Sequence, residues 1–240
     1  MSKENAPLND FPAASVIRGA GMIEAGILGG TYMAELIRPK QGMEDRYEPL
    51  WARKATIQSI ADLDGRFLTD AESREMRELA LEMWPMVDVL WRDTAPNTVA
   101  TVGKNLALDT FLAGSGYTVV GPFLGLISST SWSATAAADT MTSHAGWLEA
   151  GNANAPTYTV PRKTAAWSAA AAGAKALSAA LSFAITGAGT VKGAFLVYGT
   201  GALSTVDNTA GTLMSAGVFS GGDKVVANLD TLNVSYSLAF

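Results

Sequence analysis

Cysteine is absent from this 240-residue chain, and histidine occurs once. Without cysteine, the chain can form neither disulfide bonds nor thiolate metal sites. A single histidine also rules out the zinc sites and catalytic centres that need two or more imidazoles. We therefore expect no metal, no cofactor and no enzymatic activity.

Long apolar runs are also lacking, because Gly, Ser and Thr interrupt each candidate before it reaches membrane-spanning length. The first residues, Met1 to Asn5, lack the basic-then-apolar order of a signal peptide. These observations predict a soluble protein that is assembled in the cytoplasm and has no membrane partner.

Charge is scarce over most of the chain. Residues 1–95 hold 27 of the 39 charged side chains, and residues 96–240 hold only 12. The formal net charge of −5 argues against a nucleic-acid partner, which would need clustered Lys and Arg. A surface with so little charge is compatible with close contact between subunits, since few charges would be desolvated there. The neutral surface of an ordinary β-domain is the other interpretation.

The last third of the chain predicts strands. Over 232–240, apolar and small polar residues alternate with the period of two that is typical of a strand with one buried face. Two segments upstream, 190–198 and 213–219, are rich in β-branched and aromatic residues. Turn residues at 220–223 and 228–230 separate these elements. The pattern predicts an antiparallel meander.

A helical insertion at about 43–84 separates two strands that are expected to pair. The alternation over 31–38, which stops before Pro39, predicts the first strand. The alternation over 87–92 predicts its partner. Inside the insertion, a proline suited to a first helical turn predicts a helix over about 49–62.

The second helix of the insertion has clearer signals. Thr69 and Glu72 have the spacing of a capping box. Five apolar residues then recur at helical spacing and form one stripe, namely Met76, Leu79, Ala80, Met83 and Trp84. Two interpretations stay open, a helical hairpin packed on its own sheet or a dedicated docking surface.

Residues 1–30 mix Pro, Gly and short apolar patches without a sustained period. This composition predicts either an extended N-terminal arm that becomes ordered on a neighbouring molecule or a frayed terminus. Residues 31–240 are predicted to form a mainly-β domain, an antiparallel, jelly-roll-like β-sandwich that carries the helical insertion. A domain of this length can bury a full core without metal or disulfide.

Three residues that could form a nucleophile, a base and an acid lie close in sequence, namely Ser143, His144 and Asp139. A triad is defined by spatial geometry that sequence proximity does not supply, so we expect His144 to be a hydrogen-bonded anchor in a loop packed by Trp147. Asp62 and Asp64 before Gly65 resemble the start of a calcium loop, but the Glu that such a loop needs downstream is missing. No catalytic, cofactor-binding or metal-binding residue is therefore assigned.

Several stretches resemble a family of small tailed-bacteriophage virion proteins. The main ones are Thr101-Val102-Gly103-Lys104-Asn105-Leu106, Gly121-Pro122-Phe123-Leu124-Gly125-Leu126, Ser143-His144-Ala145-Gly146-Trp147 and Gly217-Val218-Phe219-Ser220-Gly221-Gly222-Asp223. The resemblance covers roughly residues 85–240, and members of the family are described as structural or tail-fibre-like proteins. It implies a non-enzymatic virion component, and it does not extend to the helical insertion.

Two functions follow as expectations. The first is a structural subunit of a tailed-bacteriophage virion, on the capsid surface or in a tail appendage of adaptor or fibre type. Such a subunit would bind other virion proteins (capsid, portal, tail or fibre subunits) and form a homo-oligomer. The alternative is a fibre-type module that recognises a host-surface glycan, with Trp51, Trp132 and Trp147 as stacking platforms if their rings are exposed.

Overall fold

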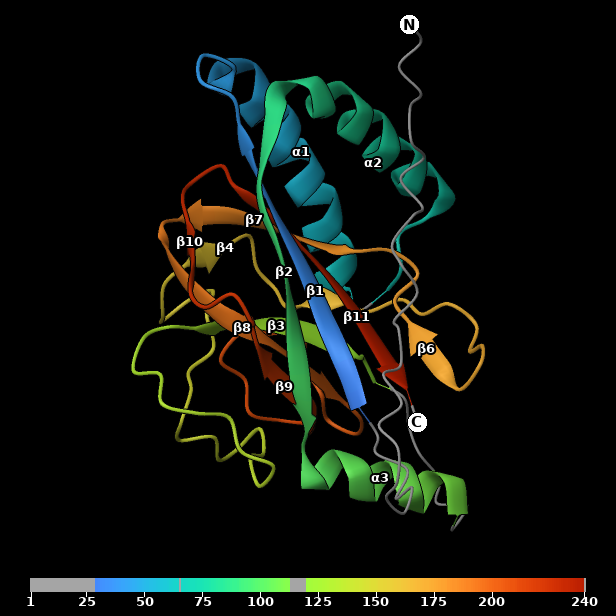
Figure 1. Cartoon of the computed structure of the whole chain (residues 1–240). Helices are drawn as coiled ribbons and strands as arrows, with labels where there is room; N and C mark the ends of the chain where they lie inside the picture. Colours follow the sequence, from blue (N-terminus) through green and yellow to red (C-terminus); the bar gives the residue numbers. More distant parts are fainter. Residues whose placement is uncertain (1–28, 65, 113–119, 240) are drawn as a thin grey trace, which may run out of the picture.

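The computed structural model describes residues 29–64, 66–112 and 120–239, which form a curled sheet flanked by helices (Figure 1). The helices in this part are α1 (Glu44–Leu63), α2 (Asp70–Met83), the 3-10 turn η1 (Trp84–Met86) and α3 (Thr101–Leu112). The strands are β1 (Gly29–Pro39), β2 (Val87–Val99), β3 (Phe123–Ser128), β4 (Thr157–Tyr158), β5 (Lys163–Thr164), β6 (Ala174–Ala176), β7 (Leu181–Gly187), β8 (Gly189–Tyr198), β9 (Thr212–Val218), β10 (Lys224–Val226) and β11 (Thr231–Ala239).

These strands join in one sheet with the order β4-β7-β11-β1-β2-β9-β8-β3-β5, and β10 and β6 are added beside β8 and β11. The pairings between them are antiparallel. The prediction of a mainly-β, antiparallel fold with inserted helices is therefore confirmed. The predicted pairing of the first strand with the segment at 87–92 is confirmed as well. Apart from Gly29 and Gly30, which begin β1, the predicted arm at 1–30 lies outside the described residues.

Strand β2 connects the two halves of the sheet. Its first part, Val87 to Pro96, pairs with β1, and its end, Asn97 to Val99, pairs with β9. A β-bulge beside Leu36 interrupts the register between β1 and β2, and such a bulge increases the local twist. The two halves therefore form opposite walls around one core.

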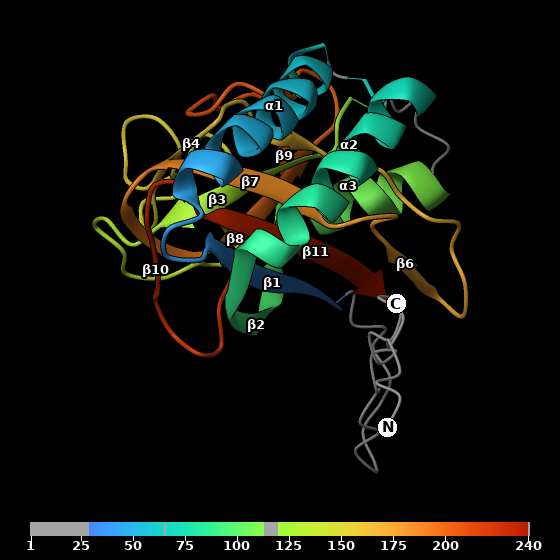
Figure 2. The same ribbon diagram turned by 90° about the horizontal axis from the view of Figure 1, so that it is seen from above.

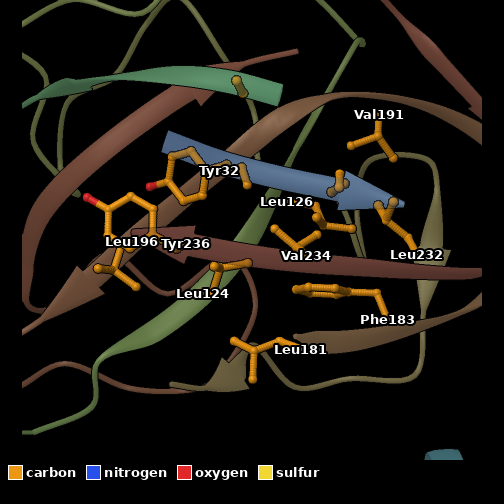
Figure 3. Close-up of a cluster of buried hydrophobic side chains, with 14 of the residues drawn as sticks. Tyr32, Leu124, Leu126, Leu181, Phe183, Val191, Leu196, Leu232, Val234 and Tyr236 are labelled. Carbon is orange, nitrogen blue, oxygen red and sulfur yellow. The ribbon is translucent and has the colours of Figure 1, made fainter. Parts of the chain in front are cut away.

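The core fills the space between these walls (Figure 3). One wall contributes alternate residues of β1, β7 and β11, and the other contributes residues of β3 and β8. The labelled members are Tyr32, Leu181, Phe183, Leu232, Val234 and Tyr236 from the first wall and Leu124, Leu126, Val191 and Leu196 from the second. The alternation of β11 thus buries one of its faces, as its sequence predicts.

The predicted meander is wrong for the last strand. Strands β8 and β9 do pair, but β11 lies on the other wall between β1 and β7. The turn after β9 leads into β10, which pairs with β8, and the chain then crosses to β11. The reason is that β1 and β2 come between β11 and β9 in the sheet, so β11 pairs with β1 along one edge and with β7 and β6 along the other.

The predicted helical hairpin is present, and both helices lie on the outer side of the sheet (Figure 2). Helix α1 begins earlier than predicted, at Glu44, and packs Tyr47 and Trp51 against outward-facing residues of β1, β2 and β7. Helix α2 begins with the predicted capping box, in which Thr69 and Glu72 bond reciprocally. Its apolar stripe is only partly covered, because α2 packs mainly on α1.

Candidate functional site

The loop that contains Asp139, Ser143 and His144 has no catalytic arrangement. Asp139 Oδ2 accepts hydrogen bonds from the Trp147 indole Nε1 at 2.9 Å and from the Ala136 N–H at 2.8 Å. The His144 ring stacks on Trp147 with centroids 4.0 Å apart, and its Nδ1 lies 2.9 Å from the Trp147 carbonyl oxygen. The carboxylate therefore holds the tryptophan and not the histidine. The prediction that His144 is a loop anchor packed by Trp147 is confirmed.

Asp62, which the sequence places at the start of a calcium-like loop, is buried and contacts the β-domain. Its Oδ1 accepts hydrogen bonds from the Thr164 N–H at 2.8 Å and from Gln58 Nε2 at 3.1 Å. Its Oδ2 lies 3.5 Å from Nζ of Lys163, which donates to the Thr159 carbonyl oxygen at 2.8 Å. Burial raises the pKa of Asp62, an effect that Lys163 opposes, and burial lowers the pKa of Lys163.

This pair sits at a gap in the wall of the sheet. On one side of the gap β4 pairs with β7, and on the other side Trp167 forms an isolated β-bridge with Leu177. Between these points, within the described part of the chain, residues 160–164 and 179–183 are not joined by strand pairing. The end of α1 covers the gap, and Asp62 supplies the acceptor that a neighbouring strand would otherwise provide. Gly65, which follows, lies outside the described residues.

A second buried ion pair joins loops on the other face of the sheet. Arg162 and Glu149 are 0% and 5% exposed, and they form two hydrogen bonds, of 2.8 Å and 2.6 Å. Arg162 also donates to the carbonyl oxygens of Leu203 and Asn208, and Glu149 accepts the Asp207 N–H. Burial raises the pKa of Glu149, and the Arg162 guanidinium opposes that shift. This cluster holds three loops together, and the sequence did not predict that these two charged side chains would be buried as a pair.

The tryptophans proposed as glycan platforms are mostly covered. Trp147 is fully buried, and Trp51, a residue of α1, is 8% exposed. Trp132 is partly exposed, and the ammonium of Lys192 lies over its ring, 5.3 Å from the centroid. The condition that the ring be exposed in a loop is therefore not met by Trp51 or Trp147. The reason is that Trp51 and Trp147 complete apolar clusters on the outer face of the sheet.

Two clefts lie on the outer side of the sheet, and the hairpin borders only the first of them. The first, which we call the hairpin cleft, has a volume of about 450 Å³ and lies between α2, the end of α1 and residues 178–182. The second, the sheet cleft, has a volume of about 500 Å³ and lies over the outer face of β1, β2 and β11. Ala180 lines both clefts, so they adjoin. Both volumes are in the range of small-ligand pockets.

A group of exposed apolar side chains comes directly after the cleft-lining residues of α2 in the sequence. We call it the apolar ridge, and it consists of Leu81, Trp84, Val89 and Leu90, which are 76%, 50%, 38% and 45% exposed. It runs from the last turn of α2 across η1 into β2. Of the ten large apolar side chains that are exposed in the described residues, seven lie between Ile60 and Leu90. Such a concentration marks an interaction surface more often than scattered single residues do.

Within the described ranges, no group of three or more His, Asp or Glu residues is arranged to hold a metal ion. The helices of this part of the molecule include none that is long and apolar enough to cross a membrane. No family model, curated protein or solved structure matches this chain.

Proposed function

We propose that this chain is a non-enzymatic structural subunit of a tailed-bacteriophage virion, placed on the capsid surface or in a tail appendage, and that it assembles through protein–protein contacts. The virion context comes from the sequence resemblance over roughly residues 85–240. The observation that carries the assembly role is the apolar ridge. The occupant that we propose for the ridge is a neighbouring virion subunit, either a second copy of this chain or another structural protein.

The ridge has the composition of an interface centre. Trp84 follows Leu81 by three positions and both are exposed, and tryptophan is enriched among the side chains that supply most of the binding energy in protein interfaces. Glu78 and Glu82 flank Leu81 along α2, and charged groups are typical of the rim of such interfaces. Burial of the exposed apolar surface of these side chains would contribute about 25 cal/mol to the binding free energy for each Å² removed from water.

The buried charges support a structural role in place of a catalytic one. Glu149 and Arg162 satisfy one another and fix loop carbonyls, and Asp62 holds the backbone of β5. Each of these groups is thus engaged in holding the fold. A catalytic acid or base must instead reach a substrate proton within hydrogen-bond distance.

The direct test is the protein composition of purified particles. The phage that encodes this chain would be purified from a lysate and examined by mass spectrometry, with imaging at moderate resolution to locate the added density. We expect the protein at a fixed copy number per particle, over the whole shell for decoration or near the tail for an adaptor or fibre. Abundance in the lysate together with absence from particles would reject the proposal.

A matched pair of variants tests the ridge. The double substitution Leu81→Ser and Trp84→Ser should abolish or strongly reduce incorporation into particles. The melting temperature should change little, because exposed positions contribute within about 0.5 kcal/mol. The control is Val225→Ser, which replaces an apolar residue of β10 that is 69% exposed. Normal incorporation of the ridge variant would exclude this surface as the contact.

The glycan-binding alternative now has less support from the site itself. Only Trp132 among the three candidate rings has an accessible face, and Lys192 already lies over it. A glycan platform needs an aromatic face beside polar groups on an open surface. Retention of the protein on purified host-surface polysaccharide, lost on Trp132→Ala, would favour this alternative over the structural role.

A further inference from the structure

We propose that the hairpin cleft binds an organic anion, a small molecule that carries one carboxylate or similar acidic group on an apolar body. The cleft has walls from five segments: Lys54 and Gln58 of α1, Arg66 to Leu68 of the connection, Ser73 to Ala80 of α2, Thr164 and Ala166 in and after β5, and residues 178–182 before and within β7. The inference concerns a surface other than the apolar ridge, and it does not depend on the virion role.

The sign of the charge in the cleft points to an anion. The charged residues that line it are Lys54, Arg66 and Arg77, and the lining contains no Asp or Glu. This is unusual in a chain whose formal net charge is −5. A concave site lined by one sign of charge concentrates ligands of the opposite sign.

Two of these cations are available to a ligand. Arg66 is already engaged, because it forms two hydrogen bonds with Glu72, of 2.8 Å and 2.9 Å. Lys54 and Arg77 form no hydrogen bond or ion pair with the residues that the structure describes. Lys54 is half-buried at the inner end of the cleft, where it also borders a small recess beneath Trp51.

The surroundings of Lys54 favour a bound negative charge. Burial lowers the pKa of Lys54, because desolvation disfavours the ammonium form. An anion placed beside the ammonium would offset this cost, and a charge-assisted hydrogen bond is about twice as strong as a neutral one. Gln58 lies on the same helix face one turn later, and its Nε2 donates to Asp62 at 3.1 Å.

The rest of the cleft suits an apolar body. Phe67, Leu68, Met76 and Leu181 contribute most of its large side chains, and Phe67 is 63% exposed. The cleft volume of about 450 Å³ accommodates a ligand of one or two rings or a short aliphatic chain. Apolar walls with a few convergent polar groups are the usual composition of small-molecule sites.

The test uses two fluorescent probes with the same apolar body. One is 8-anilinonaphthalene-1-sulfonate, which is anionic, and the other is N-phenyl-1-naphthylamine, which lacks the sulfonate. Each would be titrated into the full-length protein, with dissociation constants from fluorescence and the location from amide shifts in ¹⁵N-labelled protein. We expect the anionic probe to bind more tightly and to shift amides of residues 164–166 and 178–182.

Substitutions then separate charge from apolar contact. Lys54→Gln should weaken binding of the anionic probe by about tenfold, the effect of one charge-assisted hydrogen bond. Arg77→Gln should weaken it by about two- to fivefold, since this side chain is exposed. Both substitutions should leave the neutral probe within about twofold, because they remove charge and leave the apolar wall. The matched control is Arg74→Gln, an exposed arginine of the same helix that does not line the cleft.

Three results would overturn the proposal. The first is equal affinity for both probes, and the second is equal weakening by Arg74→Gln and Lys54→Gln. The third is a set of amide shifts confined to other surfaces, such as the apolar ridge. Because Arg77 is exposed, its replacement does not threaten folding, so a folded variant is available even if Lys54→Gln proves unstable. Loss of particle incorporation has no bearing on these outcomes.

Discussion

Arg162 and Lys163 are neighbours in sequence and are both buried, yet their surroundings differ. Successive side chains of an extended segment point to opposite faces, so Arg162 points to the loops outside the sheet and Lys163 to the core and α1. Arg162 meets two carboxylate oxygens and two carbonyl oxygens. Lys163 donates to one carbonyl oxygen, and the nearest carboxylate oxygen is 3.5 Å away.

The difference follows from the two head groups. A guanidinium has five donors in a planar fork that matches a carboxylate, whereas an ammonium is a compact point charge. The fork lets Arg162 satisfy Glu149 and two loop carbonyls at once. Asp62 Oδ2, by contrast, accepts no hydrogen bond of good geometry from the described residues. Of the two buried pairs, only the first is fully satisfied.

The two pairs also connect different parts of the molecule. Glu149 and Arg162 join segments of the β-domain to one another, whereas Asp62 and Lys163 join the helical insertion to that domain. The insertion is also attached by a small apolar cluster around Tyr47 and Trp51, by a hydrogen bond between Tyr47 and Thr231, and by one from Ser59 to the Val160 carbonyl oxygen. We infer that the β-domain is the more stable unit and that the insertion can open separately.

Removing one partner of the satisfied pair should have the largest effect on stability. Glu149→Gln keeps the shape but leaves the Arg162 charge buried without its carboxylate. Breaking a buried pair in this way costs about 3 to 5 kcal/mol. Urea denaturation followed by tryptophan fluorescence measures the loss, which should appear in the main transition because three loops are released together.

The control for that substitution is an exposed pair. Lys192 and Asp223 lie 2.5 Å apart, with side chains 22% and 47% exposed. Asp223→Asn should reduce the free energy of unfolding by less than about 1 kcal/mol. Similar losses of unfolding free energy in the two variants would show that burial does not make the Glu149–Arg162 pair more important for stability than an exposed pair.

Substitutions in the second pair, Asp62 and Lys163, should lower the free energy of unfolding by less, and the effects of the two substitutions should be strongly coupled. Lys163→Met leaves the Asp62 carboxyl without a counter-charge, and Asp62→Asn leaves the Lys163 ammonium buried without one. Each should cost about 1 to 3 kcal/mol. The double variant should lie within about 1 kcal/mol of the parent, since an apolar side chain replaces a charge that was never fully satisfied. Urea denaturation of all four proteins gives the coupling energy.

Hydrogen exchange locates the effect of the single variants. Faster amide exchange should be concentrated in α1 and α2, because the Asp62 contact attaches the insertion to the β-domain. Additive losses in the double variant, or exchange that rises equally in β8 and β9, would contradict the idea that the insertion opens separately.

Much of the sheet could be predicted from the sequence, because its signals are local. The alternation in β11 and the capping box of α2 each depend on residues a few positions apart. The position of β11 in the sheet could not be predicted, since it depends on β1 and β2 coming between β11 and β9. Strand order is set by long-range packing, which no local pattern records.

The buried charges escaped the sequence reading for a related reason. Arg162, Lys163 and Glu149 lie in segments with so few charges that each looks like an isolated surface residue. Their partners are fixed by folding, and Asp62 comes from the insertion about a hundred positions away. The burial of Trp147 could not be predicted for the same reason, because its position in a loop does not indicate that its ring completes an apolar cluster. Sequence identifies residue types suited to a site, and the fold decides which of them meet.

A third carboxylate, Asp93, extends the comparison to the rim of the sheet and should have the smallest effect. Burial raises its pKa, but hydrogen bonds from Lys224, Ser220 and the Gly221 N–H outweigh this and lower the pKa to about 2. A carboxyl with a lowered folded-state pKa stabilises the protein above its unfolded pKa of about 3.9. That contribution is lost as the pH falls through the folded value of about 2.

Asp93→Asn should therefore lower the free energy of unfolding at pH 7 by about 1 to 2 kcal/mol, since the charge-assisted bonds are lost. The difference between parent and variant should stay constant down to about pH 4 and shrink between about pH 4 and 2, because both proteins are then uncharged at this position. Urea denaturation of both proteins at intervals from pH 7 to 2.5 measures the difference. A difference that persists unchanged at the lowest pH would mean that Asp93 acts through its shape and not through its charge.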